Sequence, residues 1–169
     1  MSRLQGLAPL VSAATCVLVL GSFPGVRSLQ LQQYYAHPQN QFWPILRSLW
    51  PQAPWPADGD YAARCGCALA RGLGIWDVYA SCEREGSLDS AIRAAQLNDF
   101  PGLLRRCPQL RGIVHNGGES FRHARHTQAL GLPVYRLPSS SPANASWSFE
   151  RKLAAWREVL QHAGCLTRR

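Results

Sequence analysis

Four short apolar runs, separated by segments of helix length, constrain the fold of this chain more than any other feature. The first covers residues 16–20 (CVLVL), contains two valines and is closed by Gly21. Such a continuous apolar run is typical of a strand that is buried on both faces of a parallel sheet. The other three cover residues 74–79, 112–115 and 134–137 and are bounded by turn residues. We therefore predict an α/β fold whose parallel sheet is covered by helices on both faces, with ligands gathering at the carboxyl ends of the strands.

Apolar residues at helical spacing fill the segments between the predicted strands. We expect helices at residues 42–49, 61–69 and 121–130, and in the segment that carries Leu103 and Leu104 after Pro101. The last helix is the clearest, because apolar residues recur in it at spacings of three and four: Phe149, Leu153, Trp156 and Leu160. Ser146 or Ser148 can cap its start, and Gly164 lies past its end. The length of 169 residues predicts a single domain over residues 1–169, with its core at about 16–164.

The charge balance points to a polyanionic partner. The chain has 18 basic against 10 acidic residues, a formal net charge of +8, and Lys152 is its only lysine. Guanidinium groups bind phosphate oxygens in pairs, so nucleic acid or an acidic membrane surface is the indicated partner class; biased base composition with a need for solubility is the alternative. The apolar start resembles a signal peptide, but residues 21–25 indicate a turn after a strand, and the run is too short to cross a bilayer. We expect a cytoplasmic protein, nucleoid-associated in a bacterium, with no membrane partner.

The cysteines and serines do not indicate a metal site or a serine hydrolase. Six cysteines are few for a disulfide scaffold in a chain of this length, so we expect reduced thiols. Cys65 and Cys67 form a CxC pair with no second close pair to complete a zinc or iron–sulfur site, and we expect no metal and no cofactor. A serine esterase, which Ser120 could suggest, is excluded because Arg122 stands where the GxSxG elbow requires its second glycine.

Three clusters carry the residue types that chemistry on DNA would need. Residues 21–25 (GSFPG) form a tight turn that brings backbone amides to the carboxyl edge of the sheet. Residues 35–43 (YAHPQNQFW) combine aromatic, imidazole and amide groups, which suit base stacking and the recognition of base edges. Residues 137–144 (LPSSSPAN) follow the last strand and offer hydroxyl and backbone donors to a phosphate.

In these clusters the chain resembles the uracil-DNA glycosylase superfamily, and within it the hypoxanthine-DNA (deoxyinosine) glycosylases and the related mismatch-specific uracil glycosylases. Four shorter segments resemble the hypoxanthine branch further: residues 76–78 (WDV), 81–82 (SC), 86–89 (GSLD) and 115–117 (HNG). The resemblance implies a three-layer α/β/α sandwich with a four-stranded parallel central sheet. It also implies an enzyme that hydrolyses the N-glycosidic bond of a flipped deaminated base, with deoxyinosine as the preferred substrate.

The resemblance assigns the catalytic role to Asn40, in the second cluster. Many superfamily members carry Asp, Glu or Asn in the first turn, where this chain has Phe23. An amide cannot act as a general base, so the carbonyl oxygen of Asn40 would orient the attacking water, and Ser22 is the next candidate for that role. The alternative is that Asn40 caps the helix over residues 41–49, and both roles can hold together.

The implied base-binding residues are Phe23, Tyr35 and Asn116. Tyr35 would stack on the flipped base, and Asn116 would read the edge of that base, because an amide offers both a donor and an acceptor. A core tyrosine and an asparagine in a left-handed turn before Gly117 are the structural alternatives. Leu137 replaces a histidine of some superfamily branches, so no imidazole stabilises the leaving base from that position.

The implied DNA-binding residues lie in the second and third clusters: His37, Ser139, Ser140, Ser141 and Asn144. Ser139 would hold a phosphate, and residues 140–143 would occupy the space that the flipped nucleotide leaves. His37 could donate to a phosphate or to the base, or make only a structural hydrogen bond. Asp77 and Asp89 lie in matching segments but receive no chemical role.

Water is the expected nucleophile. A lyase would need an amine, and Lys152 lies in the last helix, far in sequence from all three clusters. We therefore expect a monofunctional glycosylase that acts as a monomer on DNA containing deaminated bases. Two alternatives stay open: a mismatch-specific uracil or thymine glycosylase, and a member of the fold that only binds nucleic acid.

Overall fold

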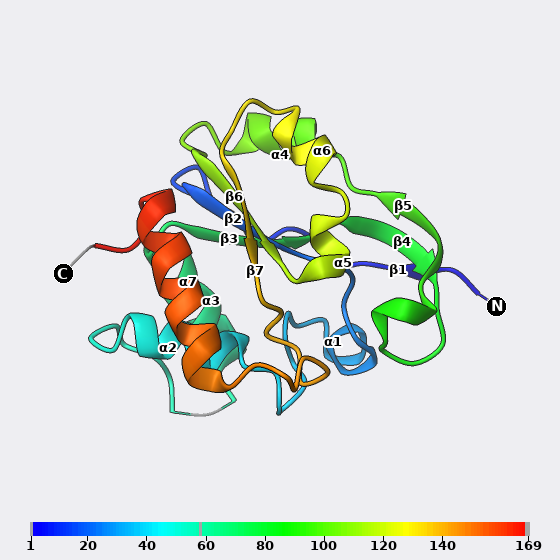
Figure 1. Ribbon diagram of the computed structural model, residues 1–169, viewed down its shortest axis with the longest axis horizontal. Coiled ribbons are helices and arrows are strands. Elements are labelled where there is room, and N and C mark those ends of the chain that lie inside the picture. Colours follow the sequence, from blue (N-terminus) through cyan, green and yellow to red (C-terminus); the bar gives the residue numbers. More distant parts are fainter. Residues whose placement is uncertain (1, 58, 168–169) are drawn as a thin grey trace.

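The computed structural model describes residues 2–57 and 59–167 and has a central parallel sheet of four strands (Figure 1). These strands are β2 (Val17–Gly21), β3 (Leu73–Asp77), β6 (Gly112–Asn116) and β7 (Val134–Leu137), in the order β3-β2-β6-β7. Every residue of β2, β3 and β6 is buried, as expected for a parallel sheet with both faces covered. The predicted α/β class and the four-stranded parallel sheet are confirmed, with some strand ends displaced by one or two residues.

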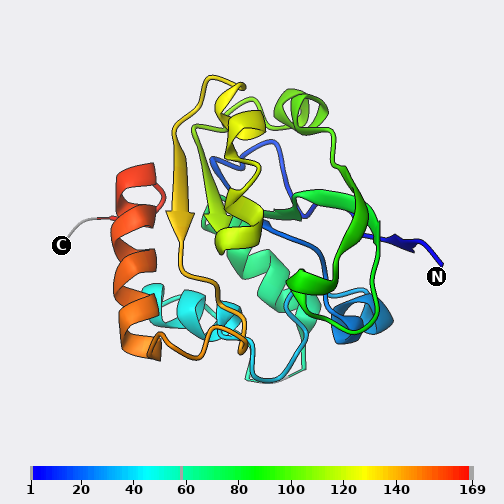
Figure 2. The same cartoon turned by 45° about the vertical axis from the view of Figure 1, so that its right-hand side comes forward.

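Helices cover both faces of this sheet (Figures 1 and 2). One face carries α2 (Phe42–Leu49), α3 (Tyr61–Ala70) and α7 (Phe149–Ala163). The other carries α4 (Phe100–Arg106), α5 (Gly118–Phe121) and α6 (Ala124–Gln128), while α1 (Val26–Leu31) follows β2. This is the predicted three-layer arrangement. Among the described residues, no helix is both long and apolar enough to span a membrane.

The last helix, α7, is fixed at both ends. The hydroxyl oxygen of Ser148 accepts a hydrogen bond from the backbone amide of Arg151 (3.2 Å), so the second of the two candidate serines is the cap. Gly164 ends the helix with φ 86°, a left-handed conformation that glycine adopts without strain. Trp156 lies on the buried face of the helix and is fully buried. Its indole N–H donates to the carbonyl of Pro138 (3.2 Å). The helix therefore also positions the chain that follows β7.

The helix predicted over residues 121–130 is wrong as a single element, because α5 and α6 divide it. The buried imidazole of His115 accounts for the break. Its two nitrogens contact the hydroxyls of Ser120 (2.7 Å) and Thr127 (2.8 Å). Seven residues of a continuous helix would separate these hydroxyls by about 10 Å, too far to reach one ring.

A second sheet is present that the sequence does not predict. It is antiparallel, with strands β1 (Leu4–Gln5), β4 (Tyr79–Glu83) and β5 (Arg93–Leu97) in the order β1-β4-β5. The run predicted as one strand at 74–79 divides between the two sheets at Val78. The amide of Val78 donates to the Gly21 carbonyl (2.8 Å), while its carbonyl accepts from the Asn98 amide (2.9 Å).

The register of the main sheet brings four strand ends to one edge. Gly21 pairs with Asp77 across β2 and β3, and Asn116 pairs with Leu137 across β6 and β7. All four strands run in the same direction, so the loops that follow them gather at this carboxyl edge. Such an edge is where open α/β sheets bind ligands.

Candidate active site at the carboxyl edge of the sheet

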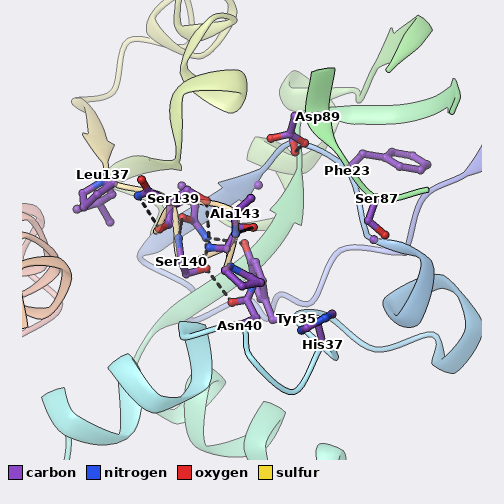
Figure 3. Close-up of a pocket in the computed structure, with 18 of the residues that line it drawn as sticks. Phe23, Tyr35, His37, Asn40, Ser87, Asp89, Leu137, Ser139, Ser140 and Ala143 are labelled. Carbon is purple, nitrogen blue, oxygen red and sulfur yellow. Dashed lines mark hydrogen bonds between the residues drawn. The ribbon is translucent and has the colours of Figure 1, made fainter. Parts of the chain in front are cut away.

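A cavity of about 1030 Å³ opens at the carboxyl edge of the main sheet (Figure 3). The last residues of all four strands line it. It also brings together all ten residues that the sequence singled out: Ser22, Phe23, Tyr35, His37, Asn40, Asn116, Ser139, Ser140, Ser141 and Asn144. Two carboxylates without a predicted role, Asp77 and Asp89, line the same cavity.

Tyr35 forms an aromatic platform in this cavity. Its backbone has φ 55°, a left-handed conformation that is uncommon for a residue with a side chain and is often found at functional sites. The ring stacks on Phe42, with centroids 4.0 Å apart and planes at 21°. The hydroxyl oxygen accepts a hydrogen bond from the Asn116 side chain (3.1 Å). Burial raises the pKa of Tyr35 well above its usual value, so the phenol stays neutral.

Ser140 links the two asparagines of the site. Its backbone amide donates to Asn116 Oδ1 (3.0 Å), and its hydroxyl oxygen accepts from Asn116 Nδ2 (3.0 Å). The same hydroxyl donates to Asn40 Oδ1 (2.9 Å). Ser140 is only 1% exposed. The sequence placed residue 140 among those that enter the duplex, whereas its side chain here points inward and joins β6 to the start of α2.

Asn40 makes the capping bond that the sequence offers as the alternative to its catalytic role. The residue before α2 is Gln41, yet Asn40 Oδ1 accepts a hydrogen bond from the Phe42 amide (3.0 Å). With the second bond, from Ser140, both lone pairs of this oxygen are in use. Because a backbone N–H needs an oxygen acceptor, the Phe42 bond also fixes which end of the amide is Oδ1. The Nδ2 hydrogens of Asn40 are therefore the groups with capacity for a ligand.

The first turn presents Ser22 to the cavity and turns the ring of Phe23 away. That ring is buried, and the Arg84 guanidinium lies 5.3 Å from its centroid. Figure 3 shows the ring directed away from Tyr35. The backbone of Phe23, rather than its ring, can therefore meet a base. The hydroxyl of Ser22 donates to Asp89 Oδ1 at 2.6 Å.

Two further hydrogen bonds connect the loop between β4 and β5 to the first turn and to the start of α1. The Arg84 guanidinium donates to the Pro24 carbonyl (2.7 Å), and the Ser87 hydroxyl oxygen accepts from the Val26 amide (2.9 Å). These bonds hold Asp89 at the cavity wall. Partial desolvation raises the pKa of the Asp89 carboxyl, while the Ser22 hydroxyl bonded to it acts in the opposite direction.

Asp77 is a buried carboxyl at the cavity wall. It ends β3, is 5% exposed, and its Oδ2 is buried with no hydrogen-bond partner. Burial, together with the nearby Asp89, raises the pKa of Asp77 to about 7, against the opposing effect of Arg84. Asp77 lines the cavity, and a carboxyl with a raised pKa at such a wall is a candidate partner for a ligand. Its place as the one charged residue within the apolar run 74–79 is the sequence signal that could have identified it.

His37 and two of the serines lie at the rim. His37 is exposed, and its Nδ1 accepts from the Gln39 amide (3.1 Å), so Nε2 is the nitrogen available to a ligand. Ser139 Oγ accepts from the Ser141 amide (3.1 Å), and Asn144 Nδ2 donates to the Ser139 carbonyl (3.1 Å). These bonds bend the loop into turns. The hydroxyl oxygen of Ser139 only accepts in them, so its O–H can still donate to a ligand.

Lys152 lies close to the site, because the last helix begins soon after the third cluster. Its ammonium donates to the carbonyl of Ser141 (3.4 Å), on a loop that lines the cavity. The residue is 2% exposed and lies outside the cavity wall, and burial lowers its pKa. Burial outside the cavity wall, rather than distance in sequence, therefore argues against Lys152 as the nucleophile of a lyase.

The side chains that face the cavity offer stacking, amide hydrogen bonds, hydroxyls and two carboxylates. In the part of the chain that the structure describes, no group of three or more His, Cys, Asp or Glu side chains is placed to hold a metal ion. Leu137, the residue that the resemblance aligns with a histidine of some superfamily branches, is 1% exposed and contributes only an apolar surface.

Comparisons with known proteins agree with this fold. The sequence model of the uracil DNA glycosylase superfamily matches residues 8–162. A hypoxanthine DNA glycosylase from Methanosarcina acetivorans is 34% identical over 158 residues, 94% of this chain and 98% of that protein. One from Methanosarcina barkeri is 32% identical over 157 residues, 93% of this chain and 98% of that protein. A solution NMR structure of a candidate uracil DNA glycosylase from M. acetivorans has a TM-score of 0.82 at 33% identity, covering 96% of this chain and 99% of that one. These matches extend over nearly the whole of both chains, and the chain belongs to the uracil DNA glycosylase superfamily.

Proposed function

We propose that this protein is a DNA glycosylase that hydrolyses the N-glycosidic bond of a flipped deaminated base, with hypoxanthine as its preferred base, and leaves an abasic site. The observation that carries the proposal is the Tyr35 platform, which hydrogen bonds connect to Asn116, Ser140 and Asn40 in one cavity. The two relatives named hypoxanthine DNA glycosylase support the choice of base. Extrusion of the nucleotide is needed because the reacting bond is inaccessible inside a duplex.

The flipped base would stack on Tyr35. Stacking of a base on an aromatic ring contributes ~1–3 kcal/mol. The ring is held in place by Phe42 behind it and by the hydrogen bond from Asn116 to its hydroxyl. Because the phenol stays neutral, it adds no charge that would repel a departing anionic base.

Asn40 would act on the departing base. Its oxygen already accepts two hydrogen bonds, so its Nδ2 hydrogens would donate to the negative charge that develops on the base as the glycosidic bond breaks. The donors at its oxygen polarise the amide and strengthen these N–H groups. Donors that are fixed before the reaction stabilise the transition state without further reorganisation.

Phosphates would be held at the rim of the cavity. Arg27 and Arg136 line it, as do His37 and the hydroxyls of Ser139 and Ser141. Such contacts position a duplex without reading its sequence. We propose that one copy of the chain provides the whole site, because every group named here belongs to the same cavity.

A panel of duplexes that each contain one deoxyinosine, deoxyuridine or deoxyxanthosine tests the proposal. Base release, detected as alkali-labile sites under single-turnover conditions, should be fastest for deoxyinosine. Faster release of uracil would identify a mismatch-specific uracil glycosylase instead. Tight binding of all three duplexes without base release would identify a member of the fold that only binds DNA.

Sodium borohydride should trap no covalent adduct between the protein and deoxyinosine-containing DNA. A Schiff base needs an amine within reach of the sugar, and Lys152 is buried outside the cavity. A bifunctional glycosylase trapped on its own substrate serves as the positive control. An adduct that disappears in Lys152→Met would contradict the proposed hydrolysis by water.

Gly21→Ala should slow base release by about tenfold, which corresponds to ~1.4 kcal/mol. A Cβ atom at this position would lie 2.5 Å from Asp77 Oδ1 and 3.1 Å from Tyr35 Oη, so the cavity wall must shift. The matched control is Gly66→Ala in α3, where nothing lies within 4 Å of the added atom. Equal single-turnover rates for both variants would mean that the base does not bind against this wall.

A further inference from the structure

Two carboxylates face the cavity without a bonded cation. In the described part of the chain the one ion pair joins Arg122 to Glu119, so Asp77 and Asp89 take part in none. Both line the cavity. Unpaired carboxylates are unexpected at the binding site of a protein with net charge +8 whose proposed substrate is a polyanion, because they repel it. Direct roles in the reaction would explain them, such as stabilising a positive charge or delivering a proton.

Asp77 lies beside the hydroxyl end of the platform. An added Cβ on Gly21 would come close to both Asp77 Oδ1 and Tyr35 Oη, which places the two groups over the same backbone atom. The other oxygen, Oδ2, is buried and has no partner. In its protonated form the carboxyl has an O–H donor, for which a base on the platform offers nitrogen and oxygen acceptors.

Asp89 reaches the cavity from the loop between β4 and β5. The hydroxyl of Ser22 donates to its Oδ1 at 2.6 Å, and this bond favours the ionised carboxylate. The first turn has Phe23, with its ring turned away, and therefore no acid of its own. The hydrogen bond from Ser22 holds the carboxyl of Asp89, which comes from a distant segment, next to that turn. In Figure 3, Asp89 and Asn40 lie on different sides of the cavity.

We propose that the two carboxyls divide the chemistry of base release: Asp77 protonates the departing base, and Asp89 stabilises the cationic sugar and accepts a proton from the attacking water. The inference rests on the proposed function. The bond between C1′ and the base nitrogen breaks, its electron pair goes to the base, and the proton of Asp77 neutralises the base. The water oxygen bonds to C1′ and its proton passes to Asp89. Exchange of protons with solvent then restores both groups. Two carboxyl groups serve glycoside hydrolysis in the same way.

The groups around the pair suit this division. Asp77 is faced by Asp89, Arg84, Tyr34, Tyr35 and Tyr61, and Asp89 by Asp77, Arg84, Glu119, Tyr35 and Tyr79. Burial, with the charge of Asp89, holds the pKa of Asp77 at about 7, so the acid is present at and below neutral pH. The Ser22 bond and the Arg84 charge oppose the burial that raises the pKa of Asp89.

The pH dependence of deoxyinosine cleavage tests the inference. The wild-type single-turnover rate should rise with pH as Asp89 ionises and fall above about pH 7 as Asp77 loses its proton. Asp77→Asn should remove the alkaline limb and Asp89→Asn the acid limb, each lowering the maximal rate by about 10²-fold. Affinity for the duplex should not weaken in either variant, because each loses a negative charge. A purely structural role would lower the rate and leave both limbs in place.

Two further variants complete the test. Ser22→Ala keeps both carboxyls and removes the bond that favours ionised Asp89, so the acid limb should move to higher pH. Glu85→Gln, on the same loop but outside the cavity wall, should retain the wild-type profile. Wild-type rates and both limbs in the aspartate variants, or an unmoved acid limb in Ser22→Ala, would overturn this inference and leave the proposed function intact. A wild-type protein that releases none of the three bases would overturn the proposed function, and this inference with it.

Discussion

Asn40→Ala should reduce the single-turnover rate of hypoxanthine release by about 10²–10³-fold, the usual loss when one donor to a developing negative charge is removed. Affinity for the duplex should change little, because this contact forms mainly in the transition state. The Phe42 amide also loses its acceptor, which costs about 1 kcal/mol of stability at the start of α2. Rates at saturating protein, binding by fluorescence anisotropy and a thermal melt together separate these effects.

Asn40→Asp distinguishes the amide donors from the carbonyl oxygen. A carboxylate can still accept from the Phe42 amide and the Ser140 hydroxyl, so the start of α2 is preserved, but it has no hydrogens to donate. If the N–H groups act on the departing base, Asn40→Asp should lose as much rate as Asn40→Ala. A rate at or above that of the wild type would show instead that the oxygen orients water, as the sequence alone predicts. Unchanged rates in both variants would remove Asn40 from the mechanism.

The main sheet could be predicted because burial on both faces leaves a continuous apolar run in each central strand. The second sheet could not, since β5 is almost entirely exposed and β1 has only two residues. The division of the run at 74–79 is equally invisible in sequence, because Val78 is apolar and buried like its neighbours. What separates the two strands there is hydrogen bonding to Gly21 on one side and to Asn98 on the other.

The composition of the site could be predicted from motifs at strand ends, but the orientation of its groups could not. Ser140 and Asn40 are 100 residues apart in the chain, and their hydrogen bond determines which atoms of Asn40 face the cavity. The ring of Phe23 turns away because Arg84, from a distant loop, covers it. The contact between Ser22 and Asp89, 67 residues apart, likewise depends on the packing of that loop.

Asn116→Ala should slow base release and also change the ratio of hypoxanthine to uracil release. The ratio should change by about tenfold if the two bases differ by ~1.4 kcal/mol in the contact energy that they lose. Both Nδ2 hydrogens of Asn116 are used, by Tyr35 and Ser140, while Oδ1 accepts only from the Ser140 amide. The second lone pair of Oδ1 can accept the ring N–H that hypoxanthine and uracil both carry. A purine and a pyrimidine place this N–H at different distances from the sugar, so one fixed oxygen cannot fit both equally.

Ser140→Ala tests whether Asn116 contacts the base itself or only holds its neighbours Tyr35 and Ser140 in place. This variant breaks the hydroxyl links from Ser140 to both asparagines but keeps the backbone bond to Asn116 Oδ1. If Asn116 contacts the base, the release ratio should change in Asn116→Ala and in the double variant, while Ser140→Ala lowers both rates in proportion. If Asn116 acts only through Ser140, the double variant should be no slower than Ser140→Ala and no ratio should change, because the two residues then form one unit. That second outcome would contradict the base-reading role and make Asn116 a positioning residue for Ser140 and Tyr35.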